Sequence, residues 1–228
     1  MWRRNILDRS RFITIIPAYN EEMIIGNVIN RALPFSNVLV VNDGSSDETE
    51  IKAEKAGAEV ITNSANLGYV KSLNNGLSWA TKRKIKYAIF MDADGEHSPK
   101  LIKTFIHEIE KSEPDIIFGI RTRYARLSEK LFGLFFAKLF GVYDPLCGMK
   151  CINIKLWDVY GPMKYSYTFG IDMYLKALLA NKKFIQIEVY GKNRVDTPRV
   201  GSVISTNIKI SFGLFCIILF YFKSCVFK

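Results

Sequence analysis

An apolar run that ends in two carboxylates constrains the fold of this chain most. Residues 88–91 read Ala-Ile-Phe-Met, and Asp92-Ala93-Asp94-Gly95 follows at once. A run this apolar predicts a strand covered on both faces, as in the parallel sheets of α/β proteins. Ligands of such sheets bind beyond the carboxyl ends of the strands. We therefore expect Asp92 and Asp94 at a ligand site.

Two carboxylates this close repel each other unless a cation lies between them. Hard oxygen ligands of this kind suit Mg²⁺ or Mn²⁺, which usually keep waters and also bind substrate phosphates. Asp92 and Asp94 are thus candidate metal ligands and candidate catalytic residues. The alternative is a strand-to-helix turn in which Asp94 or Ser98 caps the next helix.

Strand and helix patterns alternate through the first half of the chain. Expected strands cover residues 12–16, 38–41, 59–62, 88–92 and 115–119, with helical patterns at 21–33, from 46, from 67, and at 99–111. This alternation predicts an α/β fold with a mostly parallel, doubly wound sheet and helices on both faces. The length suits one such domain, which we expect to cover residues 1–202.

Two strongly apolar segments mark the second half. Residues 127–141 predict a helix with an aromatic face beside Lys130 and Lys138, which fits either a core helix or one at a membrane interface. Residues 203–228 are expected to be a membrane-associating segment. Its uncharged part, 210–222, is shorter than the ~20 residues that span a bilayer. An interfacial or re-entrant helix is the first interpretation, a tilted span the second, and a core helix or an interface within a homo-oligomer the third.

The net charge of +10 implies an acidic partner. No zinc-finger, helix-turn-helix or RNA-binding pattern is present, so a phosphorylated substrate or an anionic membrane surface is favoured and no nucleic-acid partner is expected. The four cysteines show no disulfide or metal-ligand spacing, and no signal-peptide pattern occurs. These features predict a reduced, cytoplasmic protein.

Polar clusters follow five successive predicted strands, at residues 17–22, 42–47, 66–68, 92–94 and 119–123. Asn, Asp, Gly and Ser also dominate turns for local reasons, so any one cluster could be turn chemistry. Five clusters at five strand ends instead favour one shared ligand site.

At these clusters the chain resembles the inverting family 2 glycosyltransferases with a GT-A fold. The resemblance rests on Ile-Pro-Ala-Tyr-Asn-Glu-Glu at 16–22, Val-Asn-Asp-Gly-Ser-Ser-Asp at 41–47 and Met-Asp-Ala-Asp-Gly at 91–95, and it covers roughly the first half. Residues 92–99 and 144–150 are similar to the dolichyl-phosphate mannose synthase branch, which usually has an aromatic residue at the position of Met149. In the tail, Arg199-Val200-Gly201-Ser202 resembles an R-x-G-x-S motif of that branch, with Val203 in place of the usual Lys, and Arg194 offers an alternative alignment.

The resemblance implies a UDP- or GDP-sugar donor and a nucleotide-sugar site formed by Pro17, Tyr19, Glu21, Asp43, Gly44, Asn66, Gly68, Lys71, Asp92 and Ala93. Tyr19 would pack near the base or ribose, and Asp43 would accept a hydrogen bond from the base imide. Asp43 also fits an Asx-turn with Gly44, and Lys71 also fits a solvated surface lysine. The metal at Asp92 and Asp94 would stabilise the departing nucleoside diphosphate.

In the resembled branch the acceptor is a polyprenyl phosphate. Arg121 and Arg123 would hold that phosphate through their planar donors, with Arg194, Arg199 and Ser202 as further candidates. The alternative for the first pair is a surface charge pair.

An ionised phosphate needs no general base, whereas a sugar hydroxyl would need a carboxylate. Asp144 and Asp172 are the candidate bases, and Asp172 fits the first turn of a helix equally well.

Three functions therefore compete. The first is a metal-dependent inverting glycosyltransferase that moves a sugar to a membrane polyprenyl phosphate of the dolichyl type, at the cytoplasmic face of a membrane. The second transfers to a saccharide hydroxyl in cell-surface glycan assembly, and the third is a nucleotide-sugar-binding protein without turnover. The intact Asp92-Ala93-Asp94 weighs against the third, and the apolar segments and basic charge favour the first over the second.

Overall fold

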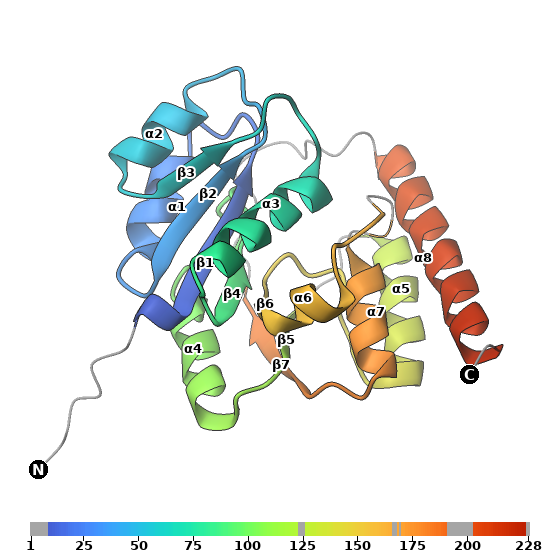
Figure 1. Ribbon diagram of the computed structural model, residues 1–228. Helices are drawn as coiled ribbons and strands as arrows, with labels where there is room; N and C mark the ends of the chain where they lie inside the picture. The colour runs from blue at the N-terminus through green and yellow to red at the C-terminus, as the bar shows by residue number, and fades with distance from the viewer. Residues whose placement is uncertain (1–8, 123–125, 166–167, 169, 191–202, 227–228) are drawn as a thin grey trace, which may run out of the picture.

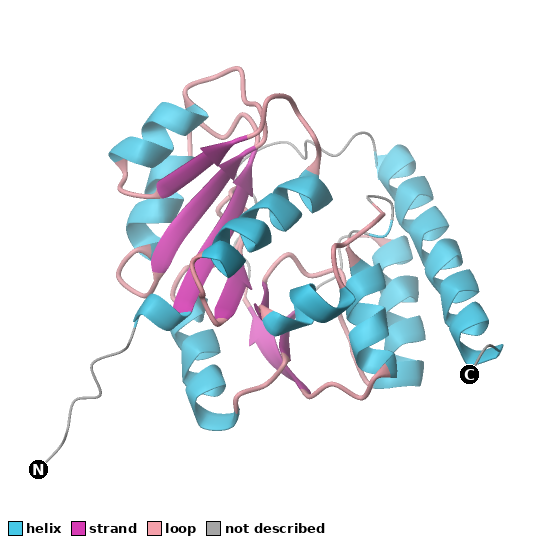
Figure 2. Cartoon of the chain, viewed as in Figure 1, coloured by secondary structure: helices cyan, strands magenta, loops and turns pink. Residues whose placement is uncertain are grey.

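A seven-stranded sheet with helices on both faces forms the centre of the protein (Figures 1 and 2). The computed structural model describes residues 9–122, 126–165, 168, 170–190 and 203–226. The strands are β1 Phe12–Ala18, β2 Asn37–Asn42, β3 Glu59–Thr62, β4 Tyr87–Phe90, β5 Ile116–Arg121, β6 Lys150–Asn153 and β7 Phe184–Val189. The helices are η1 Arg9–Arg11, α1 Ile25–Ala32, α2 Thr49–Lys55, α3 Tyr69–Lys82, α4 Leu101–Ser112, α5 Leu127–Phe140, α6 Lys155–Tyr160, α7 Ile171–Leu179 and α8 Val203–Val226.

The strand order is β3-β2-β1-β4-β6-β5-β7. All neighbouring strands are parallel except β6, which runs antiparallel to both β4 and β5. The predicted mostly parallel α/β sheet is thus confirmed. The antiparallel β6 is new, and its first residue therefore lies at the sheet edge where the parallel strands end. It also separates the end of β5 from the other four polar strand ends.

The sheet buries an apolar cluster on each face because side chains alternate along a strand. In β1, Ile13 and Ile15 pack toward α3 and the helices α5–α8, whereas Phe12 and Ile16 pack toward α1, α2 and α4. All four side chains are essentially inaccessible to solvent. This two-sided burial is what the uninterrupted apolar strands of the sequence predict.

The first helices begin later than the sequence pattern suggests. α1 begins at Ile25 instead of Glu21, and α2 at Thr49 instead of Ser46. The backbone N–H of Glu21 donates to Thr49 Oγ1 at 2.7 Å, so the two loops bind each other. Polar side chains that bind loop backbone compete with helix formation in this way.

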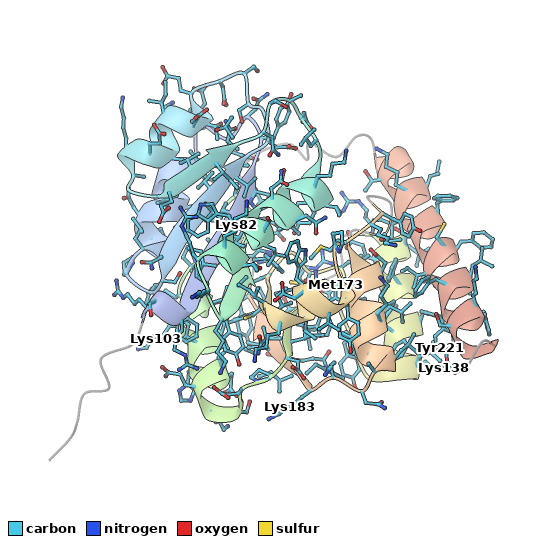
Figure 3. All side chains as sticks on the ribbon, viewed as in Figure 1. Lys82, Lys103, Lys138, Met173, Lys183 and Tyr221 are labelled. Carbon is cyan, nitrogen blue, oxygen red and sulfur yellow. The ribbon has the colours of Figure 1, made fainter. Side chains whose placement is uncertain are left out.

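α8 is one continuous helix of 24 residues that packs against α5 and α7. Ser128 donates to Asn207 at 2.6 Å near the start of the α5–α8 pair, and the rings of Phe140 and Tyr221 lie 5.8 Å apart near its end. The two helices therefore run parallel, side by side, and Figure 3 labels Lys138 and Tyr221 close together at their lower ends. The inner face of α8 joins the core through Ile210 and Ile217.

Candidate active site

A cavity of about 340 Å³ opens at the carboxyl edge of the sheet, directly beside Asp92 and Asp94. Its walls come from the ends of β1, β4 and β5, the start of α3, the loop before β6, and the residues just before α5. The lining residues are Pro17, Glu21, Tyr69, Asp92, Ala93, Asp94, Glu96, His97, Arg121, Arg126, Leu146, Gly148 and Lys150.

Asp92 is one of the carboxylates that line this cavity. His97 Nε2 is 3.6 Å from Asp92 Oδ2, and a Cβ at Gly148 would overlap the same oxygen. Burial favours the neutral acid, but the close contact with His97 and the charges of His97, Lys150 and Arg121 outweigh it. The pKa of Asp92 therefore lies below its usual value, and the carboxylate is ionised near neutral pH.

His97 is the buried partner of this carboxylate. Burial disfavours the imidazolium, but the close contact with Asp92 and its charge, together with the charges of Glu96 and Asp94, raise the pKa of His97. Its Nδ1 atom is buried and has no hydrogen-bond partner in the described part of the chain. Gly148 and His97 thus fix the Asp92 carboxylate from two sides.

Asp94 is held by the turn that follows β4. The backbone N–H of Glu96 donates to Asp94 Oδ1 at 3.0 Å, and Gly95 has a φ of +71° that favours glycine. Asp92 and Asp94 thus supply two carboxylates to one cavity. Among the described residues no group of three or more His, Cys, Asp or Glu side chains could enclose a metal ion. Two carboxylates, with water and substrate phosphate for the remaining positions, match the ligand set of Mg²⁺ or Mn²⁺.

Asp43 fastens a loop to the end of β2. Its carboxylate accepts hydrogen bonds from the backbone N–H groups of Leu67 at 2.9 Å and Gly68 at 2.8 Å, and from Asn63 Nδ2 at 2.8 Å. Gly44, at φ +70°, leaves room for the same loop, because a Cβ there would lie 2.6 Å from the carbonyl carbon of Ala65. The Asp43 carboxylate therefore binds the backbone at Leu67 and Gly68, a contact that was not predicted from the sequence.

The other predicted nucleotide residues divide into two groups. Pro17, Glu21 and Ala93 line the cavity. Tyr19, Asn66 and Lys71 are exposed and lie outside its lining.

Arg121 is anchored by acidic side chains of the second half. Its Nε and Nη2 donate to the two oxygens of Asp144 at 2.8 and 3.0 Å, and its Nη1 lies 3.4 Å from Glu129. Arg126 donates to the other oxygen of Glu129 at 2.8 Å. Glu129 thus orients two arginines that line the cavity together.

The two candidate general bases lie elsewhere. Asp144 is 1% exposed, is bound to Arg121, and does not line the cavity, so the structure makes it an anchor for that arginine. Asp172 lies in the first turn of α7 and accepts hydrogen bonds from Lys164 N and Thr168 Oγ1, each at 3.0 Å. It borders a separate cavity of about 240 Å³ beside α8, so its position corresponds to the helix-terminal alternative. The remaining acceptor candidates, Arg123, Arg194, Arg199 and Ser202, lie outside the described residues.

Sequence reasoning did not select several residues of the cavity. Four of them lie in the segments that resemble the dolichyl-phosphate mannose synthase branch, but no role was assigned to them: Glu96, His97, Gly148 and Lys150. The other two, Tyr69 and Arg126, belong to no motif. Each of the last two stands at the start of a helix that follows a strand end. Their position at the start of a helix that follows a strand end is the sequence signal that could have identified them as cavity residues.

Exposed apolar side chains stand on both α5 and α8, and this set is called here the apolar ridge. It is formed by Leu127, Leu131 and Leu134 of α5 and by Ile208, Phe212, Phe215, Leu219 and Phe222 of α8, all of them exposed. On α8 these residues recur at the spacing of one helix face. The helix segment 206–224 is long and apolar enough to cross a membrane. Only 22% of it is buried within the protein.

The sheet order, the strand-end cavity and the solved neighbours define a GT-A fold. A structure of glucosyl-3-phosphoglycerate synthase from Mycobacterium tuberculosis, in complex with Mn²⁺, uridine diphosphate and glucosyl-3-phosphoglycerate, superposes with a TM-score of 0.74. The identity is 20%, and the match covers 91% of this chain and 78% of that one. Residues 13–132 match the model of Glycosyl transferase family 2, and the chain belongs to that family.

Relatives with curated names extend this picture. An uncharacterized protein of Methanocaldococcus jannaschii is 29% identical over 78% of this chain and 86% of its own length. Dodecaprenyl-phosphate galacturonate synthase of Rhizobium johnstonii is 26% identical over 85% of this chain and 57% of its length. Undecaprenyl-phosphate mannosyltransferase of Micrococcus luteus is 32% identical over 49% of this chain and 48% of its length. The chain thus spans about half the length of these two enzymes.

Proposed function

We propose that this protein is a metal-dependent inverting glycosyltransferase that moves a sugar from a nucleotide-sugar donor to a polyprenyl phosphate at the cytoplasmic face of a membrane. One observation carries the proposal: a single cavity is lined both by Asp92 and Asp94, called here the carboxylate wall, and by Arg121 and Arg126, called here the arginine wall. The names of the two relatives above, both polyprenyl-phosphate enzymes, support the choice of acceptor.

The carboxylate wall is assigned to the donor. Asp92 and Asp94 would hold Mg²⁺ or Mn²⁺, which when bound offsets the negative charge that the nucleoside diphosphate gains as the sugar leaves. His97 keeps Asp92 ionised and oriented for that task. Asp43 would shape the nucleotide side by holding the loop at residues 67–68.

The arginine wall is assigned to the acceptor. Arg121 and Arg126 are positioned by Asp144 and Glu129 and would bind oxygens of the acceptor phosphate. A phosphate oxygen then forms the bond to the anomeric carbon while the bond to the diphosphate breaks on the opposite face. Because that oxygen is already ionised near neutral pH, no protein base is required. This fits a structure in which Asp144 and Asp172 are engaged away from the cavity.

The apolar ridge is assigned to the membrane. Arg126 immediately precedes Leu127, the first ridge residue, so the arginine wall and the ridge adjoin. α8 packs along the domain from Asn207 to Tyr221, and a bilayer would meet only its outer face. This favours a helix that lies in the membrane surface over one that crosses it. A lipid phosphate could then reach the cavity while its chain stays in the bilayer.

The test is a transfer assay on the full chain with Mn²⁺ or Mg²⁺. A panel of UDP- and GDP-sugars is offered with undecaprenyl phosphate, with undecaprenol as the matched acceptor that lacks the phosphate, or with a soluble oligosaccharide. We expect a product mass only with the lipid phosphate and only with a divalent cation. Transfer to the oligosaccharide alone would overturn the acceptor and favour glycan assembly, and no transfer from any donor would overturn the enzymatic proposal.

A further inference from the structure

Lys150 is a buried cation at the bottom of the cavity. It is the first residue of β6 and pairs in register with Phe90 of β4 and Phe118 of β5. It therefore lies at the end of β6 and is flanked by a strand on each side. Its side chain is only 6% exposed and nevertheless lines the cavity beside Asp92. Lysine is almost never buried without a compensating partner.

Lys150 differs from the two arginines of the same cavity in its partners. Arg121 and Arg126 are paired with Asp144 and Glu129. Lys150 Nζ donates to the backbone carbonyl of Cys147 and lies 5.7 Å from the centre of the Tyr174 ring. Within the described residues it forms no ion pair.

The surroundings leave this ammonium group with donors to spare. An ammonium has three N–H donors, and the hydrogen bond to Cys147 accounts for one. Burial, together with the charge of Arg121, lowers the pKa of Lys150, and the nearby Asp144 and Asp92 carboxylates oppose that shift. A charge that is buried, only partly compensated and open to a cavity on one side is suited to an anion that enters that cavity.

We propose that Lys150 binds a phosphate oxygen of a substrate between the carboxylate wall and the arginine wall. The inference rests on the proposed function for the nature of the substrate. The phosphate could belong to the diphosphate of the donor or to the lipid acceptor, because both would enter this cavity. Lys150 acts there as a point charge, whereas the arginines present planar, preoriented donors.

The test removes the charge with Lys150→Met, which keeps the length of the side chain, and restores it with Lys150→Arg. Lys155→Met is the matched control, because Lys155 is exposed at the start of α6. Calorimetry measures binding of pyrophosphate without metal and of UDP and GDP with Mn²⁺. Steady-state assays measure kcat and the KM for undecaprenyl phosphate, and thermal unfolding of every variant checks the fold.

We expect Lys150→Met to weaken anion binding about ten- to hundredfold, the loss typical of a hydrogen bond to a charged group. Weaker binding of pyrophosphate and nucleotide assigns Lys150 to the diphosphate. A higher acceptor KM with unchanged nucleotide affinity assigns it to the lipid phosphate. Lys150→Arg should recover part of either loss.

Unchanged binding and KM in a folded Lys150→Met protein would overturn the role of Lys150. If Lys150→Met does not fold, unaltered affinities in a folded Lys150→Gln protein, which also lacks the charge, would overturn it equally. A wild-type protein that binds pyrophosphate through Lys150 but transfers no sugar would overturn only the proposed function.

Discussion

The two halves of the cavity use carboxylates in different ways. Before β5, Asp43 and Asp94 accept hydrogen bonds from backbone N–H groups of nearby loops. After β5, Asp144 and Glu129 pair with arginines, and Asp144 meets Arg121 across 23 residues of sequence. The first arrangement shapes loops around a ligand, and the second holds positive side chains in place. Carboxylates thus stabilise the two regions by different interactions: hydrogen bonds from backbone N–H groups before β5, and ion pairs with arginines after it.

The largest effect is expected for Asp92 and Asp94, the two carboxylates that follow β4 and line the cavity. Asp92→Asn or Asp94→Asn should lower turnover by roughly 100- to 1,000-fold, because charge stabilisation at the leaving group is lost. EDTA should act on the wild type in the same way. Steady-state kinetics with Asp158→Asn as the exposed control measure this. Full activity in EDTA would contradict the proposed metal dependence.

A carboxylate of the second half should instead act through stability. Asp144→Asn leaves Arg121 buried with Glu129 alone, and the free energy of unfolding should fall by about 3 kcal/mol. Urea unfolding followed by circular dichroism measures the loss. The double variant Arg121→Met/Asp144→Leu should recover much of that stability while losing acceptor use. If Asp144→Asn is as stable as the wild type, the distinction between the two halves fails.

Asp43 should show a smaller effect that is confined to the donor. Asp43→Ala removes the acceptor for Leu67 N and Gly68 N, and affinity for the nucleotide should fall about ten- to hundredfold. Calorimetry with UDP and GDP measures this, and the KM for the acceptor should stay unchanged. If Asp43→Ala weakens acceptor use as strongly as nucleotide binding, the assignment of donor and acceptor to different walls of the cavity is wrong.

The smallest effect is expected at the apolar ridge. Phe212→Ser, Phe215→Ser and Leu219→Ser together should reduce binding to anionic liposomes by about tenfold or more, because exposed apolar area is lost. Ile217→Ala is the inward-facing control and should instead lower the free energy of unfolding by about 2–5 kcal/mol. Flotation and urea unfolding separate the two. A wild type that does not float with liposomes but dimerises through the ridge would contradict the membrane assignment.

The donor half could largely be predicted from the sequence. The expected strand at 59–62 coincides with β3, and the expected strand before Asp92 is β4. The apolar runs are local, and the turn chemistry of Asp94 with Glu96 acts over two residues. Such patterns involve only neighbouring residues, so they can be recognised without knowing how the rest of the chain folds.

The acceptor half needed the tertiary structure. β6 was not predicted, because four residues of an antiparallel strand leave little periodicity, and its insertion between β4 and β5 is what brings Lys150 to the cavity. The pairing of Arg121 with Asp144 joins residues 23 positions apart and makes a candidate base the anchor of an arginine.

By itself, the sequence determined an α/β sheet whose strand ends carry Asp92 and Asp94, and a final segment apolar enough for a membrane. Only the tertiary structure decided which face of α8 is buried, through Ile210 and Ile217, and which face is left to form the ridge. The physical reason is that a helix with apolar residues on all sides lacks the amphipathic pattern that would mark its buried face. Which face is buried therefore depends on the helices that pack against it. The pairing of Arg121 with Asp144 was decided in the same way, because the two residues lie 23 positions apart in the sequence.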